Sequence, residues 1–133
     1  TNEIERVPRA ARAAMTAGQS AVVYTSRATK IAQGRAGELH IGERVSSALV
    51  DVVRQIDQRP RFFIAKGGIT SSDVATLGLG ARRVRILGQI LPGVPVWKLG
   101  AESRFPGMAY VVFPGNVGTD ESLAEALQQC RGE

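Results

Sequence analysis

Cysteine, histidine and long apolar runs are nearly absent from this sequence, and each absence excludes a class of protein. The single cysteine, Cys130, cannot form an internal disulfide, which suits a reducing cytoplasm and predicts a packing residue. With one histidine, His40, the chain offers neither a conventional metal cluster nor a nucleophilic triad. Its apolar runs, such as residues 21–24, are far too short to span a bilayer. We therefore expect a cytoplasmic protein with no membrane segment.

Lysines and aromatic residues are also scarce, although the chain is basic. It carries a formal charge of +5, and only Lys30, Lys66 and Lys98 among its 17 basic residues are lysines. Such a balance suggests anionic partners, nucleic acid included. The arginines are scattered, however, and aromatic residues make up only 5%, without the interleaving that stacks bases. A small phosphate-bearing ligand fits at least as well.

Short β-rich segments alternate with helical patterns along the chain, which predicts a single α/β domain over residues 1–133. We expect a three-layer sandwich with a mostly parallel sheet. Strands are expected at residues 21–26, 61–66, 84–88, around Val96 and Trp97, and at 108–113. Helices are expected at residues 8–17, 40–57, 71–79 and 120–129, the last buried through Leu123, Leu127 and Cys130. Pro95 should restrict its strand to a sheet edge or lie at the start of the strand.

The strongest local feature is the stretch AKGGITSSD at residues 65–73. Gly67 and Gly68 follow a hydrophobic strand, where backbone N–H groups can converge on an anion at close approach. The hydroxyls of Thr70 and Ser71 could add donors to phosphate oxygens. A side chain at Gly68 should force a disallowed φ and block the approach. The alternative is a plain capping box from Thr70 to Asp73.

A second glycine turn, FPGNVGTDE at residues 113–121, repeats the order of strand, turn and helix. Gly115 and Gly118 could approach a nucleotide closely, or the turn could be an ordinary connection capped by Thr119 or Asp120. In an open parallel sheet both turns would lie at the carboxyl ends of their strands, where ligands bind. Lys66 precedes its glycines, so the first turn is not a Walker A motif.

Other candidates have a structural interpretation that we favour over a functional one. Trp97 could stack on a base, but core packing is the preferred interpretation. Arg27, Lys30 and Arg35 lie in a polar stretch that could meet phosphates, and a solvated loop is preferred there. His40 is expected near a helix start as a surface or capping residue.

Four motifs together resemble the C-terminal part of the four-carbon acid sugar kinases. They are YTSR (24–27), FIAKGGITSSDVATLGLG (63–80), LGQILPGVPVW (87–97) and VVFPGNVG (111–118), and the resemblance covers essentially the whole chain. It implies phosphoryl transfer from ATP, with Mg²⁺, to acids such as erythronate, threonate or 3-oxo-tetronate. Carried over to this sequence, the nucleotide contacts would be Gly67, Gly68, Ile69, Thr70, Ser71, Gly115, Asn116 and Gly118.

The resemblance also has two gaps. Family members are longer: an N-terminal domain holds the sugar acid, and a Gly-Ser-rich nucleotide loop lies ahead of this segment. We therefore expect the C-terminal nucleotide-binding domain of a longer kinase, inactive by itself, and assign no catalytic residue. The competing hypotheses are a basic nucleic-acid-binding α/β module, with steep salt dependence and no preference for ATP, and a scaffold or oligomerisation domain without a ligand.

Overall fold

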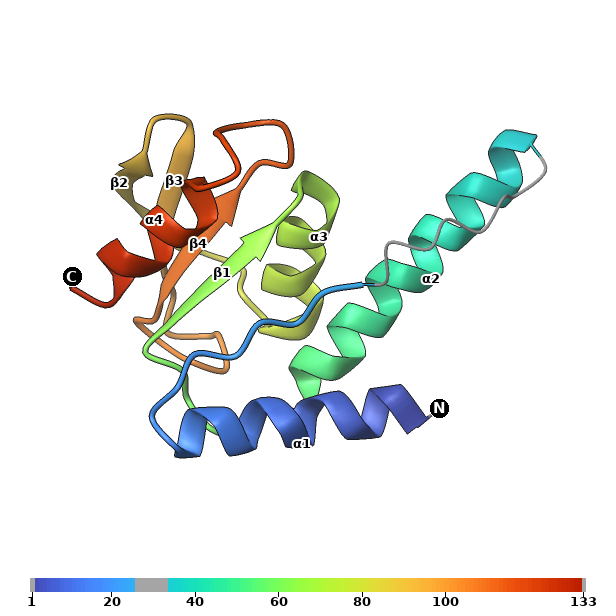
Figure 1. The fold of residues 1–133 in the computed structure, drawn as a ribbon, viewed down its shortest axis with the longest axis horizontal. Coiled ribbons are helices and arrows are strands. Elements are labelled where there is room, and N and C mark those ends of the chain that lie inside the picture. Colours follow the sequence, from blue (N-terminus) through green and yellow to red (C-terminus); the bar gives the residue numbers. More distant parts are fainter. Residues whose placement is uncertain (1, 26–33, 133) are drawn as a thin grey trace. The chain divides into compact units, whose positions relative to one another are not determined.

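The computed structural model describes residues 2–25 and 34–132, with the backbone alone for Asn2 and residues 34–43 (Figure 1). The described chain divides into two compact units, Thr1–Gln58 and Arg59–Glu133. In the described residues the first unit is helical, and the sheet belongs to the second. No helix in the described ranges is long and apolar enough to cross a membrane. That residues 1–133 form one domain stays a prediction.

Two helices form the first unit: α1 (Asn2–Thr16) and α2 (Gly34–Arg54). Both begin earlier than expected, and α1 runs through Pro8 instead of starting there. The charges explain the longer α1, because an acidic first turn suits the positive helix end and Glu3 pairs with Arg6 at 2.7 Å. Arg12 on α1 pairs with Asp57, just beyond α2, at 3.2 Å.

The first expected strand, residues 21–26, is wrong over its described part. Residues 21–25 lie in no helix or strand, and Ser26 falls outside the described residues. Val22 and Tyr24 are 69% and 82% exposed. The apolar, β-branched composition predicted a strand, but a strand also needs a partner for its backbone hydrogen bonds, and no ladder includes this segment. The polar loop residues Arg27 and Lys30 also lie outside the described residues.

The second unit contains four strands and three helical segments. They are β1 (Phe62–Lys66), α3 (Gly68–Asp73), the π-helix η1 (Val74–Gly78), β2 (Val84–Leu91), β3 (Val94–Leu99), β4 (Ala109–Phe113) and α4 (Ser122–Cys130). All four strands correspond to expected ones, and so do the helices, with shifted ends. The short helix expected at 71–79 begins earlier, at Gly68, and changes to π geometry at Val74.

The sheet has the order β1-β4-β3-β2, and its strand directions correct the expectation of a mostly parallel sheet. Only β1 and β4 pair in parallel, whereas β4–β3 and β3–β2 are antiparallel. The connections explain this: Pro92 and Gly93 alone join β2 to β3, and a parallel crossover needs a dozen residues or more. Pro95 lies in an inner strand, but at its second residue, as its start-of-strand alternative required.

Helices pack on both faces of the sheet, and the α/β fold class is confirmed. Tyr110 faces α3, because its hydroxyl donates to the Ser71 carbonyl at 2.7 Å. Side chains alternate along a strand, so Val111 and Phe113 face the opposite side, where they form a core cluster with Ala126 of α4. Cys130 packs against that cluster, which confirms it as a packing residue.

The burial of α4 differs in one position from the expected pattern. Ala126 is fully buried, whereas Leu123 is 38% exposed. The helix begins at Ser122 instead of Asp120, so Leu123 falls in its first turn, and Ala126 takes the central position on the buried face. The fully buried residue is thus a small one, which lets the helix lie close to the sheet.

Candidate functional site

The two glycine turns lie side by side at one end of the sheet, where β1 and β4 terminate. β1 and β4 are adjacent and parallel, and Lys66 pairs with Phe113 at the last position of both strands. The arrowheads of the two strands point the same way in Figure 1. Gly67 N–H donates to the Phe113 carbonyl at 2.8 Å, and a Cβ on Gly115 would lie 4.0 Å from Gly67 Cα. The turns therefore meet at the carboxyl ends of their strands.

The first turn is closed by backbone geometry that only glycine adopts readily. Gly67 has φ 103° and ψ 138°, a region nearly restricted to residues without a Cβ. Immediately after it α3 begins, and Ser71 N–H donates to the Gly67 carbonyl at 2.8 Å. The N–H groups of residues 68–70 come before the first intrahelical bond, so they have no partner within the helix. Gly68 and Ile69 are exposed and Thr70 is half-buried.

Ser71 is buried beneath this turn and does not line its surface. Its side chain is 1% exposed, and its hydroxyl donates to the Ala65 carbonyl at 3.0 Å. The Tyr110 hydroxyl donates to the Ser71 carbonyl, and burial raises the pKa of that phenol. The expected hydroxyl donor to phosphate at Ser71 does not fit this geometry. Sequence reasoning missed Tyr110, although its position in an alternating strand pattern placed it on one face of the sheet.

Two further expectations about the first turn are wrong. The capping box is absent, because the N-cap residue is Gly67 without a side-chain cap, and Thr70 lies inside the helix. The positive φ belongs to Gly67 and not to Gly68, where a Cβ would meet nothing within 4 Å. A side chain at Gly68 therefore strains no backbone, and it would extend into open space above the turn.

The second turn, Pro114–Gly118, presents exposed backbone next to the first. Gly115, Asn116 and Gly118 are all exposed, and Gly118 has φ 87°. A Cβ on Gly118 would lie 2.7 Å from Ser122 Cβ, so this position has no room for a side chain. Neither expected cap forms: α4 has no side-chain cap, and Ser122 Oγ instead accepts from Thr119 N–H at 2.7 Å.

The remaining candidates are structural or lie outside the described side chains. Trp97 stacks on Tyr110 with ring centroids 5.9 Å apart, which agrees with its preferred interpretation as a packing residue. The side chains of Arg35 and His40 fall among those that are not described. No cluster of three metal-ligating side chains occurs among the described residues.

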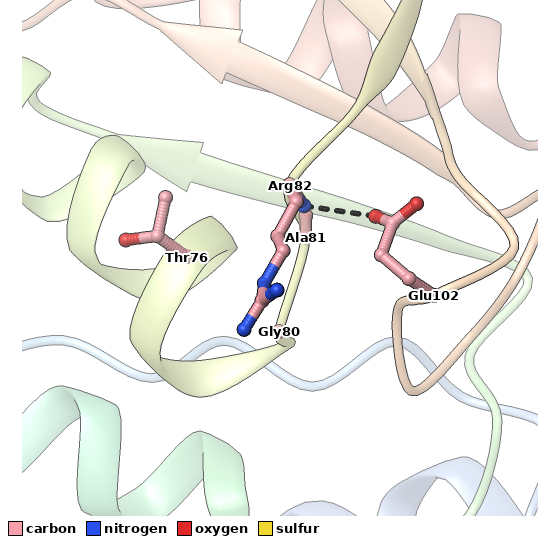
Figure 2. A pocket seen from close by; sticks show the side chains of 5 residues that line it. All are labelled: Thr76, Gly80, Ala81, Arg82 and Glu102. Carbon is pink, nitrogen blue, oxygen red and sulfur yellow. Dashed lines mark hydrogen bonds between the residues drawn. The ribbon is translucent and has the colours of Figure 1, made fainter.

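A depression of about 610 Å³ lies elsewhere on the second unit (Figure 2). It is lined by Thr76, Gly80, Ala81, Arg82 and Glu102. The adjoining strand β2 begins at Val84 opposite Leu99, the end of β3, and β3 runs antiparallel to β4. The depression thus lies at the end of the strands away from the glycine turns. Its carboxylate is already satisfied: Glu102 Oε2 accepts from Arg82 N–H at 2.8 Å and from Arg83 N–H at 3.2 Å.

Hydrogen bonds from backbone N–H groups lower the pKa of Glu102, and the bond from Arg82 contributes most. The dashed line in Figure 2 shows the Arg82 bond that ties the two loops together. This carboxylate therefore acts as a brace between loops. Of the two places, the glycine turns carry the features of a ligand site.

Two exposed glycine turns thus lie beside each other at the carboxyl ends of adjacent parallel strands, where open α/β sheets commonly bind ligands. Comparison with known proteins shows the family of the chain. The model of the family described as the nucleotide-binding C-terminal domain matches residues 1–123, and the chain belongs to that family. No curated protein matches the chain.

A solved structure shares the fold. It is a domain of unknown function (DUF1537) from Bordetella bronchiseptica, with bound citrate, in a domain-swapped dimer. The two chains are 22% identical with a TM-score of 0.61, and the alignment covers 90% of this chain. The chain spans 29% of the length of that protein.

Proposed function

We propose that this chain is the ATP-binding domain of a kinase that phosphorylates a four-carbon sugar acid of the erythronate, threonate or 3-oxo-tetronate class. The observation that carries the proposal is the contact between the two glycine turns, with Gly67 bonded to Phe113 and Gly115 next to Gly67. Membership of the nucleotide-binding C-terminal domain family supports a nucleotide as the ligand. The sugar-acid class rests on the resemblance of the four motifs.

In this proposal the first turn holds the phosphates through backbone N–H groups. The N–H groups of Gly68, Ile69 and Thr70 have no partner within α3, and the absence of a side chain at Gly68 leaves room for phosphate oxygens. Ser71 contributes by fixing the turn, since its own hydroxyl is bonded to Ala65.

The second turn would contact the same nucleotide from the neighbouring strand. Gly115 and Gly118 allow close approach of the ligand to the backbone, and the exposed Asn116 amide can donate or accept. Mg²⁺ would arrive on the phosphates, because it is commonly bound through phosphate oxygens and water. When bound, it would neutralise charge on the transferring group.

The domain by itself is proposed to bind nucleotide without turning it over. Phosphoryl transfer depends on positioning the acceptor hydroxyl in line with the phosphate, and the sugar acid would be held by a domain that this chain does not contain. The turns thus supply nucleotide binding and orientation, while acceptor activation comes from elsewhere in the parent protein.

Calorimetry with Mg-ATP, Mg-ADP and a DNA duplex, at low and at raised salt, tests the binding. We expect saturable, weak one-to-one binding of both nucleotides. Tighter, steeply salt-dependent binding of DNA without any response to ATP would favour the nucleic-acid module instead. A coupled ADP-release assay with erythronate, threonate and 3-oxo-tetronate tests the activity. We expect no turnover, and acid-dependent turnover would contradict the assignment of the acceptor site to another domain.

A further inference from the structure

Lys66 lies at the point in the sheet where both glycine turns begin. It is the last residue of β1, directly before Gly67, and its partner in the ladder is Phe113, the last residue of β4. Both chain segments that form the candidate site therefore begin at this pair. Its side chain is exposed, and no ion pair of Lys66 occurs among the described residues.

The ring of Phe113 contacts both the ammonium group of Lys66 and the second turn. Lys66 Nζ lies 5.7 Å from the centroid of this ring, a cation–π contact. The edge of the same ring borders the second turn, because a Cβ on Gly118 would lie 3.7 Å from Phe113 Cζ. Phe113 is 1% exposed, so the packing around its ring holds the ring in place. Lys66 thus precedes the first turn directly in the sequence, and the ring that its ammonium group contacts borders the second turn.

We propose that Lys66 binds the phosphate tail of the nucleotide directly and is the positive charge of this site. The inference rests on the proposed function and adds a residue that the expected nucleotide contacts did not include. Backbone N–H groups carry only partial charges, whereas a nucleotide tail carries several negative charges. A compact ammonium on a flexible stem can follow phosphate oxygens across the seam between the turns.

A competing explanation is that Lys66 protects the sheet from aggregation. β1 is an edge strand of the sheet, and a charged lysine there discourages pairing with another chain. That role requires charge at the edge but makes no demand on nucleotide binding. The two explanations therefore differ in what a neutral substitution does to affinity.

The test compares Lys66→Met with Lys98→Met. Methionine keeps an unbranched apolar stem against Phe113 and removes the charge. Lys98 is the matched control, because it is also exposed but pairs with Ala109 at the start of β4, at the end of the strands away from the glycine turns. Calorimetry with Mg-ATP and Mg-ADP at low salt should show about tenfold weaker binding for Lys66→Met and little change for Lys98→Met. The loss should shrink at raised salt, where charges are screened.

Lys66→Arg provides a second variant that retains the charge, and it should bind within a few-fold of wild type. Circular dichroism and thermal melting confirm that each variant is folded. Wild-type affinity in folded Lys66→Met, or an equal loss in Lys98→Met, would overturn the role of Lys66 and leave the proposed function intact. A loss in Lys66→Arg as large as that in Lys66→Met would also overturn it. A wild-type protein that binds neither nucleotide overturns both proposals together.

Discussion

Alanine at each of two adjacent glycines should separate the folding role of the first turn from its binding role. Gly67 and Gly68 are neighbours in the chain, and replacing either by alanine adds one methyl group. Their backbones differ, because Gly67 has φ 103° whereas Gly68 does not have a positive φ and opens α3. The same chemical change therefore meets strained backbone at one position and open space at the next.

The expected magnitudes follow from that difference. Gly67→Ala should lower the free energy of unfolding by about 1–3 kcal/mol, the cost of a side chain in a sparsely populated region. Gly68→Ala should leave stability unchanged or raise it by about 0.5–1 kcal/mol, because alanine is favoured over glycine in a helix. For Mg-ADP affinity we expect the larger effect at Gly68. The Gly68 methyl group would occupy the space above the turn and cost one or two charge-assisted hydrogen bonds, about tenfold to a hundredfold in Mg-ADP affinity.

Urea unfolding and calorimetry with Mg-ADP measure both quantities on the same three proteins. A Gly67→Ala protein as stable as wild type would show that this backbone position tolerates a side chain without strain. The assignment of phosphates to this turn is refuted if a folded Gly68→Ala protein binds Mg-ADP with wild-type affinity. Affinity is compared well below the melting temperature of the least stable variant, so that unfolding does not imitate weak binding.

Two further predictions concern buried side chains around the site and the core. Burial raises the pKa of Tyr110 above its unfolded value of about 10, so the stabilisation from the neutral phenol is present below that pH and is lost as pH rises past it. Tyr110→Phe should be about 1 kcal/mol less stable than wild type near neutral pH, because the bond to Ser71 is lost. This difference in stability should shrink above about pH 10. Urea unfolding measured at several pH values tests it, and a difference that stays constant with pH would count against burial of the phenol. Burial also raises the pKa of the half-buried Cys130 thiol, so a thiol reagent should label it more slowly in native than in unfolded protein. Equal labelling rates in both states would contradict its packing in the core.

The sequence by itself determined the positions of the two glycine turns and most of the elements. The four strands from Phe62 onward were predicted because apolar, β-branched runs end at glycine or proline, and these signals are local. The positions of both glycine turns, each directly after a strand, were readable for the same reason. The motifs predicted the nucleotide-binding C-terminal part of a four-carbon acid sugar kinase. The match over residues 1–123 confirms the nucleotide-binding C-terminal domain, and the kinase class stays a prediction.

Only the tertiary structure decided the strand directions, the partners of each strand and the contacts of individual turn atoms. Periodicity does not encode direction, so the antiparallel pairs of β3 became visible only with the ladder. Residues 21–25 have the composition of a strand but no partner in a ladder. The Ser71 hydroxyl, which the sequence predicted as a phosphate donor, is bonded to Ala65, and the ammonium group of Lys66 contacts the ring of Phe113. In each case the deciding contact joins residues that are not neighbours in the sequence, and the hydrophobic pattern does not reveal such a contact. Local sequence specifies what a segment can form, and long-range packing selects among those possibilities.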